Sequence, residues 1–145
     1  FGAAAGWLLI LLSGLLGNWL NAWVYYPEPH FSIGASTAVF AALGILTGIG
    51  SRLALADPEE GWALPRWLLP ALGGLTLLGL LGMGERPEGS VDVAAHISGF
   101  LCGIAIGFIG AWRQNFFIGL ERYRYSIAGL SFALLGFAWW VALSS

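Results

Sequence analysis

Long apolar runs alternate with short polar segments along the whole chain. A helix that crosses the hydrocarbon core of a bilayer needs about 20 mostly apolar residues. Polar clusters and prolines, such as those in segment 25–30, interrupt the apolar runs and end each helix. The pattern therefore predicts five membrane-spanning helices, at about residues 1–23, 34–51, 66–83, 93–112 and 125–143.

Arginine residues gather in alternate connections between these segments. Arg86 falls in one outer connection, whereas the other arginines fall on the opposite side of the membrane: Arg52, Arg66, Arg113, Arg122 and Arg124. Short loops rich in arginine face the cytoplasm. This assigns loops 52–65 and 113–124 to the cytoplasm, and the second and fourth spans then both begin at the outer face.

The composition agrees with a lipid environment. The chain has 145 residues, of which 58% are hydrophobic and only 10% charged, and its mean hydropathy is +0.79. A soluble domain carries roughly 25% charged residues. The sequence contains no basic run, so we do not expect nucleic acid as a partner. We expect the lipid bilayer to surround the protein. We expect an all-α, polytopic transmembrane helix bundle with five spans, forming a single domain over residues 1–145.

Small residues recur every three or four positions in two of the spans. The second span carries Gly34, Ala38, Ala41, Gly44 and Gly48, and the fourth carries Gly99, Gly103, Gly107 and Gly110. Such stripes allow helix backbones to approach closely within a membrane. They predict that the second and fourth spans pack against each other.

Two polar residues, Ser36 and His96, lie near the outer ends of these same spans. His96, Gly99 and Gly103 share one helical face, so packing through that face would bring His96 toward Ser36. A histidine that accepts the hydroxyl proton converts serine into a nucleophile. The competing interpretation is that Ser36 caps its helix and His96 is an ordinary interface histidine.

Three further residues near these two positions receive smaller roles. Phe40 lies one turn below Ser36 and could stack on His96, although simple packing explains it too. Asn18 and Asn21 in the first span could bond another helix, without a catalytic role.

Three acidic residues, Glu85, Glu88 and Asp92, precede the fourth span. We interpret them as part of a hydrated outer loop. They do not form the paired intramembrane carboxylates of an aspartyl protease.

The sequence resembles the rhomboid family at two motifs. Gly34-Ala35-Ser36-Thr37 is similar to the nucleophile motif Gly-x-Ser-Gly, with Thr37 where the family usually has glycine. Two spans later, Ala95-His96-Ile97-Ser98-Gly99-Phe100-Leu101-Cys102-Gly103 is similar to Ala-His-x-x-Gly-x-x-x-Gly. The resemblance covers about residues 10–112, and the fifth span resembles the extra C-terminal helix of some members.

The resemblance implies an intramembrane serine endopeptidase with a Ser36–His96 dyad. It implies that Gly34 and the Ser36 N–H help hold the oxyanion, that Gly99 permits close helix approach, and that Phe40 packs on the histidine. The implied partners are transmembrane protein substrates cleaved near the outer face. No metal or cofactor is needed, and the oligomeric state stays open.

The rhomboid core has six spans, and the two that precede the first span are not found in this sequence, which begins at Phe1. In the rhomboid family these two spans carry a His and an Asn that help stabilise the oxyanion, so both residues are missing as well. We therefore expect an N-terminally truncated chain, from a multi-pass protein of the bacterial inner membrane. The alternatives are a catalytically inactive rhomboid-like protein that binds transmembrane helices, and a small transporter or membrane scaffold.

Overall fold

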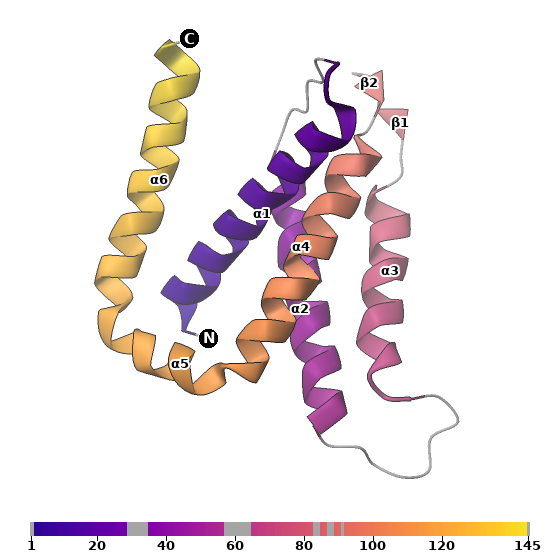
Figure 1. The fold of residues 1–145 in the computed structure, drawn as a ribbon, viewed down its shortest axis with the longest axis vertical. Helices are drawn as coiled ribbons and strands as arrows, with labels where there is room; N and C mark the ends of the chain where they lie inside the picture. Colours follow the sequence, from indigo (N-terminus) through magenta and orange to yellow (C-terminus); the bar gives the residue numbers. More distant parts are fainter. Residues whose placement is uncertain are drawn as a thin grey trace.

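A computed structural model describes residues 2–28, 35–56, 65–82, 85–86, 89–90 and 92–144. The helices are α1 (Ala3–Tyr25), α2 (Ser36–Ala56), α3 (Leu68–Gly82), α4 (Val93–Trp112), α5 (Gln114–Leu120), the 3-10 helix η1 (Glu121–Tyr123) and α6 (Arg124–Ser144). Two-residue strands, β1 (Glu85–Arg86) and β2 (Gly89–Ser90), pair antiparallel between α3 and α4. The predicted all-α helix bundle is confirmed (Figure 1).

Within the described ranges, four helical segments are long and apolar enough to cross a membrane: Ala3–Tyr25, Ser36–Ala56, Val93–Trp112 and Gln114–Ser144. The shorter α3 has 15 residues and is also apolar. Helices suit this chain because a bilayer offers no water to the backbone, and a helix bonds its own N–H and C=O groups.

Two parts of the chain differ most from the sequence-based expectation. Helix α2 was expected to end at Ser51 but continues to Ala56, because residues 53–56 are leucine and alanine, which favour helix until the Asp57-Pro58 pair. The connection over residues 113–124 was expected to be a loop, and it folds into α5 and η1.

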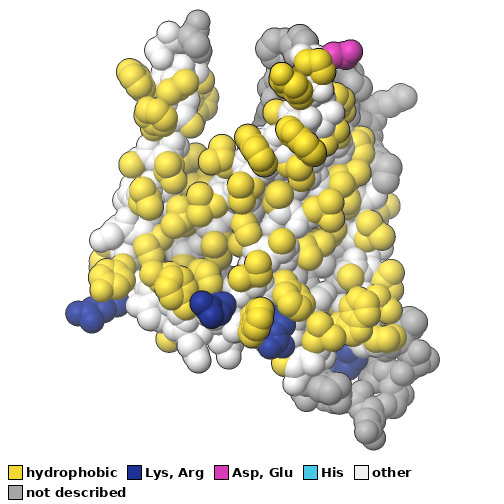
Figure 2. Space-filling view, viewed as in Figure 1, with side chains coloured by type: hydrophobic (Ala, Val, Ile, Leu, Met, Phe, Trp, Pro, Cys, Tyr) yellow, Lys and Arg dark blue, Asp and Glu magenta, His cyan; other side chains and the backbone are white. Residues whose placement is uncertain are grey.

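Hydrophobic side chains spread over the face of the bundle drawn in Figure 2, and many large ones are exposed. Trp7, Trp19, Trp139 and Trp140 are all exposed, whereas the buried residues include small and polar ones such as Ser13 and Thr47. A water-soluble fold shows the reverse arrangement. The surface therefore fits a lipid solvent, with the small residues reserved for helix contacts.

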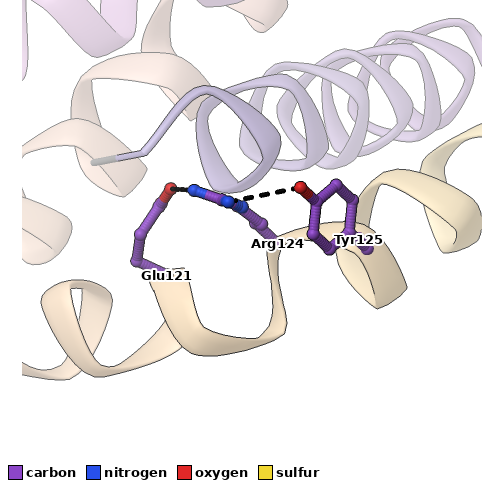
Figure 3. A network of polar contacts seen from close by, with 3 residues as sticks. All are labelled: Glu121, Arg124 and Tyr125. Atoms are coloured by element: carbon purple, nitrogen blue, oxygen red, sulfur yellow. Dashed lines mark hydrogen bonds and ion pairs between the residues drawn. The ribbon is translucent and has the colours of Figure 1, made fainter.

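Arginine side chains gather at one end of the bundle, the lower end in Figure 2. At this end Arg124 reaches two neighbours (Figure 3): its Nη1 lies 3.8 Å from Glu121 Oε1, and its Nη2 donates to Tyr125 Oη at 3.2 Å. The ends of α2 and α4 near residues 56 and 112 lie here, and their first residues lie at the opposite end (Figure 1). Both helices thus start at the same end, as the arginine distribution predicted, and the assignment of that end to the outer face stays a prediction.

Helices α2 and α4 run parallel in close contact, as their glycine stripes predicted. A Cβ at Gly103 would meet the carbonyl oxygen of Ala41, and a Cβ at Gly107 would meet that of Ile45. In each pair the α4 residue is numbered 62 higher than its α2 partner. This constant separation means that the two helices stay in register between these contacts, about one helical turn apart, so their first turns lie at the same level.

Helix α1 runs antiparallel to α2 and α4, whereas α6 stands apart from them (Figure 1). An apolar groove of about 620 Å³ lies between α1, α6 and the start of α2. Its lining includes Asn18, Ala35 and Thr37, and the last two residues flank Ser36.

Candidate active site

Helix α2 starts at the predicted nucleophile. Its first hydrogen bond runs from the Val39 N–H to the Ala35 carbonyl oxygen at 3.1 Å, and Ser36 is half-buried. The N–H groups of Ser36, Thr37 and Ala38 precede this bond, so they have no partner within the helical ladder. Exposed N–H groups in a first helical turn favour negative charge. Gly34, the other predicted oxyanion residue, lies outside the described residues.

The first turn of helix α4 is capped by the side chain of Asp92, four residues before His96. The Asp92 carboxylate accepts a hydrogen bond from the Ala95 N–H at 3.0 Å, and the Asp92 carbonyl accepts from the His96 N–H at 3.2 Å. An aspartate at this position satisfies one of the unpaired N–H groups of the first turn. His96 itself is buried, with 3% of its surface exposed.

The predicted contact between Phe40 and His96 is present. Their ring centroids lie 4.3 Å apart, with 35° between the ring planes. Phe40 is buried, and it contributes to the same apolar cluster as Phe100, which lies one turn below His96 on α4. The imidazole is therefore held by packing from both α2 and its own helix.

Three helices meet just beside this aromatic pair. A Cβ at Gly99 would meet the carbonyl oxygen of Thr37 and lie 2.9 Å from its Cγ2. A Cβ at Gly17 on α1 would lie 2.7 Å from Gly99 Cα and 3.0 Å from the same Thr37 methyl group. The Thr37 side chain thus fills the space that the two glycines leave, which explains how a branched residue fits after Ser36.

These contacts bring the outer ends of α2 and α4 together around the predicted pair. Ser36 lies one turn before Phe40 on the same face of α2, and Phe40 contacts His96. Thr37 follows Ser36 directly, and its partner Gly99 lies three residues after His96. The structure thus joins the neighbours of both residues, and the catalytic roles of Ser36, His96, Gly34, Phe40 and Gly99 remain predictions.

One element of this site was missed from the sequence. Asp92 was assigned to a hydrated loop, yet it caps α4 and accepts a hydrogen bond from Asn21 Nδ2 at 2.9 Å. The spacing of Asp92 and Ala95 is that of an N-cap, so the cap could have been recognised. The bond from Asn21 fits the expectation that this residue bonds another helix.

Comparison with known proteins agrees with this arrangement. The model of the Rhomboid domain matches residues 1–113, which run from α1 through the residue after α4. RHOMBOID-like protein 4 of Arabidopsis thaliana is 32% identical over 109 residues, which are 75% of this chain and 25% of that protein. Rhomboid-like protease 1 of Toxoplasma gondii is 30% identical over 104 residues, 70% of this chain and 32% of that protein.

RHOMBOID-like protein 5 of Arabidopsis thaliana is 29% identical over 108 residues, or 74% of this chain and 32% of that protein. The chain thus spans a third or less of the length of these curated relatives. No solved structure matches it. The family match over α1 to α4, together with the parallel α2–α4 pair and the membrane-spanning helices, shows that this chain is an integral membrane protein that belongs to the rhomboid family.

Proposed function

We propose that this protein is an intramembrane serine endopeptidase, with Ser36 as nucleophile and His96 as general base. The stacking of Phe40 on His96 is the observation that carries the proposal, because it holds the imidazole against Phe40, the residue one helical turn after Ser36. The Thr37–Gly99 contact supports it, since it closes the gap between the helices that carry the two residues. Membership of the rhomboid family supports the same reaction class.

In the proposed reaction, the Ser36 hydroxyl attacks the carbonyl carbon of a peptide bond while His96 takes its proton. His96 then returns the proton to the leaving amine, and the acyl group stays on Ser36 as an ester. A water molecule, deprotonated by His96, hydrolyses this ester and releases the acid. The dyad performs both halves without a cofactor.

The first turn of α2 would stabilise the negative oxygen of the tetrahedral intermediate. The first helical hydrogen bond of α2 is donated by Val39, so the N–H groups before Val39 form none within the helix. These N–H groups belong to Ser36 and the two residues that follow it. Fixed N–H donors aimed at a developing oxyanion are worth about 10²–10³ in rate for each donor. The N–H of Ser36 would act here, and Gly34 is the second proposed contributor.

The proposed substrates are membrane-anchored proteins cut near the outer face. The starts of α2 and α4 lie at the end of the bundle opposite the arginines, so water can reach Ser36 there without crossing the bilayer. The bacterial inner membrane stays a prediction, because the named relatives come from a plant and from Toxoplasma gondii.

A cleavage assay in liposomes tests the proposal. The full gene product is reconstituted with a fluorescent single-span protein, and the products are followed by gel. Cleavage should occur with the wild type and disappear with Ser36→Ala and with His96→Ala. Ser51→Ala is the matched control, because Ser51 lies on the same helix and bonds the Trp67 carbonyl oxygen instead, at 3.0 Å.

The outcomes separate the enzyme from the inactive alternative. Cleavage that persists in Ser36→Ala contradicts the proposal. Binding of the single-span protein without cleavage by the wild type favours the catalytically inactive rhomboid-like protein.

A further inference from the structure

Helix α1 contacts the start of α4 through a polar pair in which Asn21 is buried and Asp92 is half-buried. Asn21 on α1 donates from Nδ2 to Asp92 Oδ2 at 2.9 Å, although the two residues are 71 positions apart in the sequence. Only 2% of the Asn21 surface is exposed. Asn21 lies one turn after Gly17, where α1 approaches Gly99 closely, so the pair extends the α1–α4 contact to the end of α4.

Asp92 also forms hydrogen bonds with the first turn of α4, which carries His96. Its Oδ1 accepts from the Ala95 N–H at 3.0 Å, and its carbonyl oxygen accepts from the His96 N–H at 3.2 Å. Its two carboxylate oxygens therefore hold α1 on one side and the first turn of α4 on the other. Any shift of Asp92 relative to α1 would move the backbone of His96.

The amide of Asn21 is not explained by packing alone. Its Oδ1 is buried and has no hydrogen-bond partner within the part of the chain that the structure describes. An unsatisfied buried acceptor is unfavourable, and an apolar side chain at this position would avoid that cost. The feature that an apolar residue could not supply is the bond to Asp92.

We propose that Asn21 is a positioning residue for His96, acting through Asp92. The inference rests on the proposed function, because positioning matters for catalysis only if His96 serves Ser36. Asn21 sets the height and rotation of the first turn of α4, and Phe40 then fixes the ring itself. Neither Asn21 nor Asp92 is proposed to touch the substrate.

The test compares four forms of the full gene product with the wild type. Asn21→Ala removes the bond, and Asp92→Asn alone removes the carboxylate. The exchange Asn21→Asp with Asp92→Asn restores the bond with donor and acceptor reversed, since asparagine also caps helices well. Asn18→Ala is the matched control, because Asn18 is an exposed amide on the same helix.

The first readout is the NMR signal of the His96 ring in protein with labelled histidine, assigned by its loss in His96→Gln. Stacked on Phe40, this ring should show a ring-current shift. Asn21→Ala should reduce that shift or broaden the signal. The exchange should restore the wild-type signal, and Asn18→Ala should leave it unchanged. An unaltered His96 signal in Asn21→Ala overturns the inference, whether or not the protein is an enzyme.

The second readout is the rate at which a fluorophosphonate labels Ser36, measured well below the unfolding temperature of each variant. Asn21→Ala should slow labelling by about 10- to 100-fold, because small misplacements of catalytic groups cost rates of this size. The exchange should recover labelling to near the wild-type rate. Wild-type labelling in Asn21→Ala, or recovery of the unfolding temperature without recovery of labelling in the exchange, overturns the positioning role.

Failure of the proposed function gives a different pattern. In that case the wild type is not labelled at Ser36 at all. The NMR arm then still decides whether Asn21 positions His96.

Discussion

The ring centroid of Phe40 on α2 lies 4.3 Å from that of His96 on α4, although the residues are separated by a complete intervening helix, α3. The two planes are tilted by 35°, so the phenyl ring covers one side of the imidazole. This contact couples the rotation of the histidine to the helix that begins at Ser36. It makes the geometry of the proposed dyad depend on a residue that performs no chemistry.

Replacing Phe40 with leucine should slow the labelling of Ser36 by a fluorophosphonate by roughly two- to tenfold. An aromatic pair of this kind contributes about 0.5–1.5 kcal/mol, and its loss leaves the imidazole less well oriented. Phe116→Leu is the control, because Phe116 is exposed and pairs with Phe117 far from the site. Equal labelling rates in Phe40→Leu and the wild type would show that the stack does not orient His96.

Gly99→Ala should destabilise the bundle by about 1–3 kcal/mol, since the new Cβ meets the Thr37 carbonyl oxygen and overpacks the α2–α4 contact. The measurement is thermal unfolding in detergent. Gly136→Ala on α6 is matched to it, because nothing lies within 4 Å of a Cβ there. The control should be neutral or slightly stabilised, and a similar loss in both variants would refute the close-contact explanation.

Thr37→Gly should also lower the unfolding temperature, even though glycine is the usual family residue after the nucleophile. The threonine methyl group fills the space between Gly17 and Gly99, and removing it leaves a void that costs about 1–3 kcal/mol. Thr37→Val keeps this shape and should retain most of the stability. If Thr37→Gly unfolds at the wild-type temperature, the side chain does not fill this space.

Ser13→Ala should leave the unfolding temperature unchanged or raise it. Ser13 is fully buried in α1, and its hydroxyl has no hydrogen-bond partner among the described residues. Removing a buried hydroxyl that has no hydrogen-bond partner should stabilise the folded state by about 1 kcal/mol, because the hydroxyl no longer has to be desolvated on folding. A marked loss of stability would mean that the hydroxyl is bonded in the full protein.

The sequence predicts the helices and the central packing of this fold for simple physical reasons. Long apolar runs must form helices in lipid, and glycine at every third or fourth position identifies the faces that approach each other. The Gly103–Ala41 contact and the Phe40–His96 stack both follow from those faces. The position of Ser36 and His96 at the same end of the bundle follows from the arginine distribution.

Other features depend on three-dimensional relations that the pattern does not contain. The Asn21–Asp92 bond requires the rotation of α1 about its axis, and the large apolar residues of α1 are exposed all along the helix and give little indication of it. The direction of the Thr37 side chain depends in the same way on Gly17, which comes from another helix. The helical elbow of α5 and η1 lies among mixed polar and aromatic residues, where periodicity is weak.

Mapping the site of fluorophosphonate attachment is the sharpest test of the proposed Ser36–His96 dyad. The full gene product in detergent is treated with the reagent, digested, and analysed by mass spectrometry. We expect a single adduct on Ser36, which is absent in Ser36→Ala and strongly reduced in His96→Ala. An adduct on another serine, or labelling that survives Ser36→Ala, would contradict the Ser36–His96 dyad.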